Sequence, residues 1–125
     1  MITVVKIVLL NDKNQALLNL RSKDAKEYPN TWSFFGGGVE KGETPEEGLI
    51  REVKEEINFD LKEYKKIYEI NADNKKNIYY AGKCNGPLSS LSLGEGDDFG
   101  FFSYEETKKL FMRELNRKVL AMVFK

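Results

Sequence analysis

The chain of 125 residues contains no histidine. This absence excludes catalytic triads, metal sites and general bases that depend on an imidazole, and it leaves carboxylates to carry any acid–base or metal chemistry. The single cysteine, Cys84, has no second cysteine with which to form a disulfide within the chain, and we expect it to be a buried small hydrophobe. A reducing, cytoplasmic setting is therefore expected.

Net charge and long apolar segments are also absent. Lys and Arg together number 20, and so do Asp and Glu, so the net charge of zero offers no electrostatic surface for binding long nucleic acid. No apolar run approaches the about 20 residues that span a bilayer, and the N-terminus lacks the features of a secretory signal. We therefore expect neither a membrane nor a long nucleic acid as a partner.

The composition that remains is typical of a soluble globular domain. Hydrophobic residues make up 41% of the chain and charged residues 32%. A chain of this length can bury a core without disulfide or metal staples, and no repeat or linker divides it. We therefore expect a single domain over residues 1–125, present as a monomer or a homodimer.

The hydrophobic pattern predicts two β-hairpins and a separate short strand. Aliphatic and β-branched residues at 2–10 and 16–21 flank one polar turn, and the segments 64–71 and 77–84 flank another. Trp32–Phe35 is a short strand candidate, and we expect the three glycines that follow it to form the turn into a helix.

Two polar segments are predicted to be loops near the functional site. Residues 22–31 contain Pro29 and show no sustained period, while residues 85–98 are rich in Gly and Ser and end in acidic residues. After the second loop, residues 99–103 predict a short strand, and Ser103 can cap the first of two terminal helices. Strands and helices in this order indicate an α/β (α+β) domain.

A helix is indicated from Pro45 to Ile57. Thr44 can cap it and Glu47, three residues later, completes a capping box, while proline suits the first helical position. Asn58 tolerates the left-handed conformation and can end the helix.

The two faces of this helix differ in chemistry. At about 100° per residue, one arc is apolar and is expected to pack: Leu49, Ile50, Val53 and Ile57. The neighbouring arc is acidic and is expected to face a cavity: Glu52, Glu55 and Glu56. A like-charge pair four residues apart destabilises a helix by about 0.2–0.5 kcal/mol, so a compensating cation is expected. Oxygen ligands select a hard cation such as Mg²⁺, with Mn²⁺ as an alternative.

The segment Gly37–Phe59, GGVEKGETPEEGLIREVKEEINF, resembles the Nudix box. At the positions of that pattern the chain has Gly37, Glu43, Arg51, Glu52, Val53, Glu55, Glu56 and Phe59. Two positions depart from it, since Asn58 replaces the closing Gly, and Phe35 stands where relatives commonly have Pro before the glycines. The resemblance implies the Nudix-type α/β/α sandwich around a mixed β-sheet.

The resemblance also implies roles for individual residues. The metal ligands would be Glu52, Glu55, Glu56 and the carbonyl of Gly37. Arg51 would pair with Glu43 and orient the site, with Gly36 and Gly38 as structural residues of the motif. The catalytic set would be Glu55, Glu56, Arg51 and, from the loop 85–98, Glu95, with Asp97 and Asp98 as alternatives to Glu95. An ordinary acidic surface loop is the alternative interpretation of that last group.

Candidate substrate-binding residues lie outside the motif. Arg21 stands where relatives often place a phosphate-facing cation, with a plain surface arginine as the equal alternative. Aromatic residues that could stack on a base, or belong to the core instead, are Tyr28, Trp32, Phe34 and Tyr80. We expect the segments 22–35 and 85–98 to determine the identity of the substrate.

These features predict a Mg²⁺-dependent hydrolase that cleaves a diphosphate linkage in a nucleoside diphosphate linked to another group, with water as the nucleophile. The substrate would be a small nucleotide: a nucleoside triphosphate, a nucleotide sugar or a dinucleoside polyphosphate. One alternative is a regulatory module that binds nucleotide and hydrolyses it weakly or not at all. Another is a hydrolase of RNA 5′ ends, which the net charge of zero disfavours.

Overall fold

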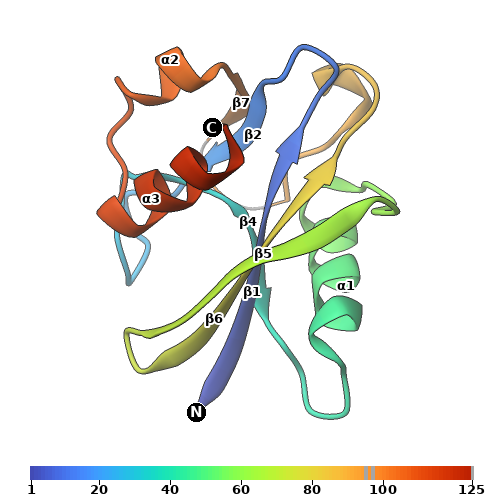
Figure 1. Cartoon of the computed structure of the whole chain (residues 1–125), viewed down its shortest axis with the longest axis vertical. Helices are drawn as coiled ribbons and strands as arrows, with labels where there is room; N and C mark the ends of the chain where they lie inside the picture. The colour runs from blue at the N-terminus through green and yellow to red at the C-terminus, as the bar shows by residue number, and fades with distance from the viewer. Residues whose placement is uncertain (95, 97, 125) are drawn as a thin grey trace.

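The structure, a computed structural model, describes residues 1–94, 96 and 98–124 and consists of one mixed β-sheet with helices on both faces (Figure 1). The strands are β1 (Ile2–Leu10), β2 (Ala16–Leu20), β3 (Trp32–Ser33), β4 (Phe35–Gly38), β5 (Tyr64–Ala72), β6 (Lys75–Lys83) and β7 (Asp98–Phe102). The helices are α1 (Pro45–Ile57), α2 (Tyr104–Thr107), α3 (Glu114–Val123) and a short 3-10 helix at Leu88–Ser90. None of the helices in these ranges is both long and apolar enough to cross a membrane. The predicted fold class is confirmed.

Strand β1 lies at the centre of the sheet and sets the position of the glycine-rich strand β4. It runs parallel to β6 on one side, and on the other side it pairs antiparallel with β2 near its end and with β4 over its middle. In the second pairing, Lys6 lies opposite Gly36 and Val5 lies opposite Gly37. The combination of parallel and antiparallel neighbours makes this the mixed sheet that was predicted.

Each face of the sheet has its own hydrophobic core. Val5 and Ile7 of β1 belong to the core under α1, whereas Val8 belongs to the core under α3. Because side chains alternate between the two faces of a strand, Lys6 projects toward the α3 face. Figure 1 shows α1 on one side of the twisted sheet and α3 on the other. Cys84 is buried in the core under α1, as predicted.

The glycine segment differs from the prediction. The strand predicted over Trp32–Phe35 is divided, because β3 ends at Ser33 and β4 begins at Phe35. The three glycines are part of β4 and are not the turn into the helix, which contains Gly42 with a φ of 90°. An added Cβ on Gly36 would lie 2.0 Å from the carbonyl oxygen of Val5, so only glycine lets β4 pass this close to β1.

The ends of α1 are as predicted, but one apolar residue of this helix is exposed and not packed. Both hydrogen bonds of the Thr44 capping box are present, and Asn58 ends the helix in the left-handed conformation with a φ of 56°. Ile50 was expected to pack, and this is wrong, since it is 39% exposed. At about 100° per residue, it lies at the border of the apolar arc. Phe35, the other departure from the motif, is buried opposite Ile7 of β1.

Candidate active site

Strand β4 brings its glycines against the acidic side of α1. The backbone N–H of Gly36 donates a hydrogen bond of 2.8 Å to Oε1 of Glu56. An added Cβ on Gly37 would lie 2.5 Å from the carboxylate of Glu52, so this carboxylate rests directly on the glycine backbone. Two carboxylates of α1 therefore flank the backbone of Gly36 and Gly37.

Arg51 ties the same helix to the loop that precedes it. Its guanidinium donates to both carboxylate oxygens of Glu43, at 2.7 and 3.0 Å, to the carboxylate of Glu52 at 2.9 Å, and to the carbonyl of Gly38 at 3.1 Å. The hydrogen bonds from Arg51 lower the pKa of Glu43, and those same bonds raise the pKa of Arg51 above its usual value. The ion pair that the Nudix resemblance implied between Arg51 and Glu43 is present.

The groups around β4 that could bind a cation are all oxygen atoms. They comprise the carboxylates of Glu52 and Glu56 and the carbonyl of Gly37. The carboxylate of Glu55 is 3.3 Å from the guanidinium of Arg51. Among the described residues, no three carboxylates come together as a complete metal cluster, since Arg51 draws Glu52 and Glu55 toward itself. Mg²⁺ keeps several waters and needs only one or two carboxylates, so this set fits such an ion.

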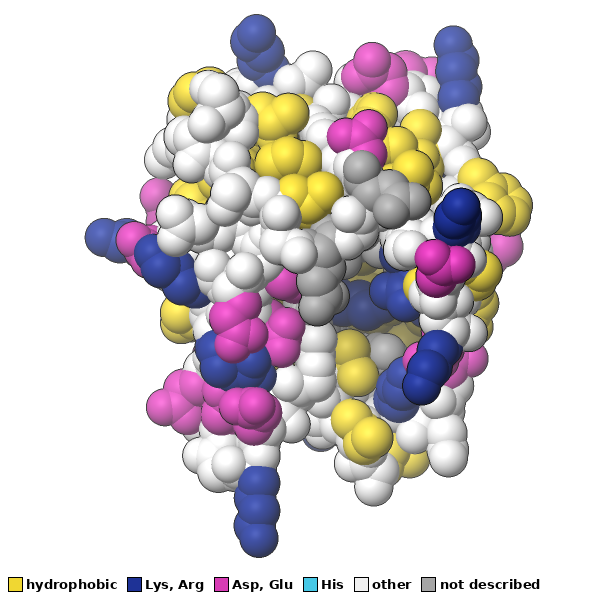
Figure 2. Space-filling view, turned by 180° about the vertical axis from the view of Figure 1, so that it is seen from behind, with side chains coloured by type: hydrophobic (Ala, Val, Ile, Leu, Met, Phe, Trp, Pro, Cys, Tyr) yellow, Lys and Arg dark blue, Asp and Glu magenta, His cyan; other side chains and the backbone are white. Residues whose placement is uncertain are grey.

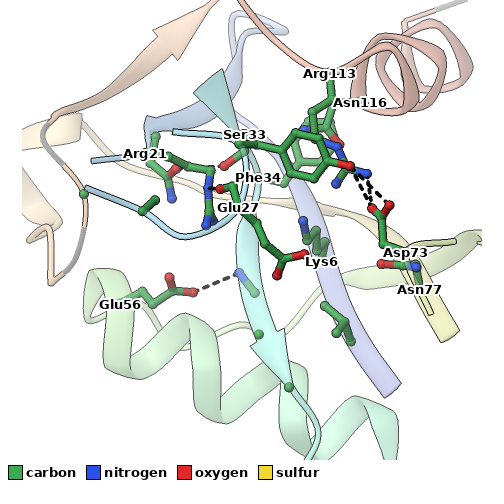
Figure 3. Close-up of a pocket in the computed structure, with 18 of the residues that line it drawn as sticks. Lys6, Arg21, Glu27, Ser33, Phe34, Glu56, Asp73, Asn77, Arg113 and Asn116 are labelled. Atoms are coloured by element: carbon green, nitrogen blue, oxygen red, sulfur yellow. Dashed lines mark hydrogen bonds and ion pairs between the residues drawn. The ribbon is translucent and has the colours of Figure 1, made fainter. Parts of the chain in front are cut away.

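A pocket with a volume of about 580 Å³ opens on the α3 face of the sheet, beside β4 (Figure 3). Strands β1 and β4 form its floor, and the loop after β2, the β5–β6 turn and the start of α3 form its walls. Glu56 lies at one end and Asn116 at the other. Figure 2 shows this side of the molecule hollowed, with Lys and Arg side chains deep in the hollow. The pocket therefore connects the acidic helix with α3.

One wall of the pocket is held by pairs of opposite charges. The guanidinium of Arg113 lies 3.8 Å from the centroid of the Tyr28 ring and forms an ion pair of 2.6 Å with Asp73. The hydroxyl of Tyr28 donates to the same carboxylate at 3.1 Å, and Lys75 pairs with Glu27 at 2.8 Å. These contacts join the loop after β2, the β5–β6 hairpin and α3, which are distant in sequence.

Two polar side chains of the pocket have no such partner among the residues that the structure describes. Asn116 is 0% exposed, and neither its amide nitrogen nor its amide oxygen makes a hydrogen bond. The ammonium of Lys6 makes no described hydrogen bond or ion pair, and burial, followed by the charges of Arg113 and Arg21, lowers its pKa to about 8. Sequence reasoning missed both residues. Lys6 had a visible signal, because it interrupts the apolar run of β1.

Of the predicted substrate-binding residues, Arg21 and Phe34 line the pocket. Arg21 follows β2, and its Nε donates to the backbone carbonyl of Glu27 at 2.9 Å. Phe34 is 4% exposed and packs edge-on against Tyr79, so its ring is mainly part of the core. Residues of the loop 22–31 also line the pocket, so the predicted position of this loop over the site depends on this pocket being the site.

Trp32 and Tyr80 lie outside the lining of this pocket. Trp32 packs edge-on against Phe102, with 4.9 Å between ring centroids. Tyr80 is 1% exposed in the core under α1, and its hydroxyl donates to Glu46 at 2.6 Å. This position corrects the assignment of Tyr80 as a residue that stacks on the substrate, because its ring is enclosed by the sheet and the helix.

Replacing Tyr80 by Phe is therefore expected to change stability and not substrate binding. The loss of the hydrogen bond to Glu46 should lower the free energy of unfolding by about 0.5–1.5 kcal/mol, measured by urea denaturation, while KM stays at the wild-type value. Tyr64→Phe is the matched control, since the Tyr64 hydroxyl makes no hydrogen bond with the described residues. A several-fold increase in KM for Tyr80→Phe would return this residue to the substrate site.

The loop 85–98 reaches the site at the end of α1. The backbone N–H of Gly94 donates to the carbonyl of Glu56 at 2.6 Å, and Gly96 lines the pocket. Glu95 and Asp97, two candidates for a further carboxylate, lie outside the described residues. The third candidate, Asp98, begins β7 and is exposed, with its carboxylate accepting a hydrogen bond from the N–H of Phe99.

The mixed sheet between helices, together with the acidic helix beside a glycine strand, defines a Nudix-type hydrolase. The family model described as the NUDIX domain matches residues 2–123 of the chain. The chain belongs to the Nudix family, and it is a hydrolase that acts on phosphorus-containing anhydrides.

Individual relatives and solved structures agree with this assignment. An RNA pyrophosphohydrolase of Nitratiruptor sp. is 30% identical over 75% of this chain and 74% of its own length. Two other proteins of that name, from Actinobacillus succinogenes and Marinomonas sp., are matched over only 30% and 32% of their own length.

Two solved structures share the fold at low identity. A MutT structure from work on Aliivibrio salmonicida and Vibrio cholerae has a TM-score of 0.83 at 22% identity, covering 98% of this chain and 96% of that one. The NUDIX domain of Shewanella oneidensis NrtR, complexed with ADP ribose, has a TM-score of 0.81 at 12% identity, covering 98% of this chain and 85% of that one.

Proposed function

We propose that this hydrolase cleaves the diphosphate linkage of a nucleoside diphosphate joined to another group, with Mg²⁺ held beside β4. The observation that supports the proposal is the continuity of the pocket, which runs from Glu56 and the glycine strand to the amide of Asn116, which has no hydrogen-bond partner within residues 1–94, 96 and 98–124. A volume of about 580 Å³ lies within the usual range for small-molecule sites. The anhydride would lie at the Glu56 end and the rest of the substrate in the pocket.

Glu52, Glu56 and the carbonyl of Gly37 would hold the cation, with Glu55 as a further candidate. When bound, Mg²⁺ neutralises charge on phosphate oxygens and makes water more acidic. Arg51 orients the site, because its bonds to Glu43 and Glu52 hold the loop and one carboxylate in place. A carboxylate, Glu55 or Glu95, would accept the proton of the attacking water.

The far end of the pocket suits the nucleoside part of the substrate. A buried amide without partners is unfavourable by about 1–3 kcal/mol, and a polar edge of a nucleobase would satisfy both atoms of Asn116. The ADP ribose bound by the NrtR domain is a nucleoside diphosphate linked to a second group, which agrees with this class. A small nucleotide is therefore the proposed substrate.

Hydrolysis of RNA 5′ ends is the second candidate. It is favoured by the name RNA pyrophosphohydrolase that the Nitratiruptor relative carries. In that case the 5′ nucleotide would occupy the same pocket and the chain beyond it would leave across the surface. The net charge of zero offers little general attraction for such a chain.

The proposal is tested by incubating the protein with four substrate classes, with Mg²⁺ and after removal of divalent metal by a chelator. The classes are nucleoside triphosphates, nucleotide sugars including ADP ribose, dinucleoside polyphosphates and 5′-triphosphorylated RNA. We expect metal-dependent cleavage of a small nucleotide, with both products identified by chromatography. Cleavage of RNA alone would favour the second candidate, and tight binding without product would indicate a regulatory module.

A further inference from the structure

We propose that Lys6 completes an anion-binding subsite on the floor of the pocket, beside Arg21, for which the Nudix resemblance already implied a phosphate-facing position, and that this subsite takes a phosphate group of the bound substrate. The subsite is built from cations, and Glu56 of α1 lines the same pocket. The proposal rests on the proposed function, since it assigns a phosphate of that substrate to residues outside the Nudix box.

The charge pairing in the pocket leaves these two cations available. Among the described residues, four cations line the pocket, and two of them, Lys75 and Arg113, form ion pairs with Glu27 and Asp73. Lys6 has no partner among the described residues, and the hydrogen bond of Arg21 goes to the neutral carbonyl of Glu27. The charged groups of Lys6 and Arg21 therefore face the cavity, which Asp24 and Glu56 also line.

Without a bound ligand, the position of Lys6 is unfavourable for the stability of the fold. It lies on the central strand between Val5 and Ile7, and the nearby charges of Arg113, Arg21 and Lys75 oppose its own. The carboxylate of Glu27 attracts it, but this group is already paired with Lys75. An apolar residue would suit such a strand better, since desolvating an unpaired charge is unfavourable. A bound anion would pair with the ammonium of Lys6 and so offset the unfavourable desolvation of its charge.

Figure 3 shows how the subsite relates to the rest of the pocket, with Lys6 between the wall formed by Asp73 and Arg113 and the Glu27 side chain. Lys6 also lies opposite Gly36 in the pairing of β1 with β4, and Gly36 bonds Glu56. The phosphate could thus belong to the anhydride itself or be an additional phosphate on the nucleoside. Both sources share the oxyanion chemistry that a lysine and an arginine bind.

Sulfate binding, measured by calorimetry at pH 7 without divalent metal, tests the subsite independently of hydrolysis. The wild-type protein is expected to bind sulfate, and Lys6→Met should weaken binding by about ten- to hundredfold, as expected when hydrogen bonds to charged groups are lost. Arg21→Met should weaken it as well. Lys62→Met, at an exposed lysine outside the pocket, should bind as the wild type does.

Thermal unfolding of the same variants separates binding from folding. Lys6→Met should unfold at the wild-type temperature or above it, because an unpaired charge is removed. Sulfate at low concentration should raise the unfolding temperature of the wild type more than that of this variant, beyond the general stabilisation that sulfate gives to any folded protein. Absence of sulfate binding by the wild type, or equal affinity in Lys6→Met, would overturn the proposal while leaving the hydrolase assignment intact.

The source of the phosphate is decided with a nucleoside triphosphate and its 3′-phosphorylated form as paired substrates. If Lys6→Met raises KM about tenfold or more for the 3′-phosphorylated form alone, the subsite takes the additional phosphate. An equal increase for both substrates assigns the subsite to the anhydride. Unchanged KM for both substrates would contradict the proposal.

Discussion

Replacing Glu56 by Gln is expected to lower Mg²⁺-dependent turnover by about 10²–10³-fold, the range seen when one electrostatic contact to a transition state is removed. The N–H of Gly36 donates to Oε1 of Glu56, and the amide oxygen of Gln can accept the same bond. The backbone arrangement of β4 against α1 should therefore survive. What is lost is the negative charge at the end of the pocket where a cation is proposed to bind.

The measurement is kcat over a range of Mg²⁺ concentrations, with thermal unfolding recorded on the same preparations. Glu63→Gln serves as the matched control, since Glu63 is an exposed glutamate outside the pocket lining. It should retain both activity and stability. Near-normal turnover of Glu56→Gln with a normal unfolding temperature would refute the assignment of the site to Glu56 and its neighbours.

The parts of the site that the sequence could predict are those determined by local spacing. The Arg51–Glu43 pair was implied by the resemblance to the Nudix box. The helix that carries Glu52 and Glu56, and the left-handed Asn58 that ends it, depend instead on intervals of a few residues within one segment. Helical periodicity and capping chemistry determine such features without knowledge of the remaining fold.

The parts that sequence reasoning missed depend on pairings between distant segments. Three consecutive glycines, as at 36–38, are compatible with a turn and with a strand. They form a strand here because β4 pairs with β1, a segment distant in sequence. The wall of the pocket joins Tyr28, Asp73 and Arg113 from three elements, which no local pattern connects. Ile50 was misassigned because the helical wheel does not indicate how wide a face the sheet covers.

Lys6 shows a different limit. A lysine within an apolar strand is visible in the sequence, but its meaning depends on which neighbouring cations are already paired. The pairing of Arg113 with Asp73 and of Lys75 with Glu27 can only be seen in the folded chain. Which charges of a pocket are paired therefore depends on the tertiary structure, and the net charge of the chain does not indicate it.

Alanine substitutions at the three glycines of β4 are expected to separate folding from catalysis. At Gly36 the added Cβ would lie 2.0 Å from the carbonyl oxygen of Val5 and 2.8 Å from the Cα of Lys6, which are both backbone atoms. Since neither can move without breaking the pairing of β4 with β1, Gly36→Ala should lower the free energy of unfolding by more than about 3 kcal/mol.

At Gly37 the added Cβ would instead meet the carboxylate of Glu52 at 2.5 Å. This group is the end of a flexible side chain, so it can turn away and leave the fold largely intact. The displaced carboxylate would leave the proposed cation site, and Gly37→Ala should therefore lose activity with little loss of stability. At Gly38 no atom of the described residues, apart from Gly38 itself and its chain neighbours, lies within 4 Å of an added Cβ. Gly38→Ala is therefore the matched control, and its free energy of unfolding should change by no more than about 0.5 kcal/mol.

Urea denaturation and kcat, measured on the three variants, separate folding from catalysis. Gly36 contacts the backbone of β1, which the fold needs, whereas Gly37 contacts the carboxylate of Glu52, which is proposed to bind the cation. Loss of activity in Gly37→Ala at wild-type stability places the chemistry where Glu52 meets the β4 backbone. If Gly37→Ala were as active as Gly38→Ala, then the position of the Glu52 carboxylate against that backbone would have no part in catalysis. A stable Gly36→Ala protein would show that β4 does not pair with β1 as closely as this structure has it.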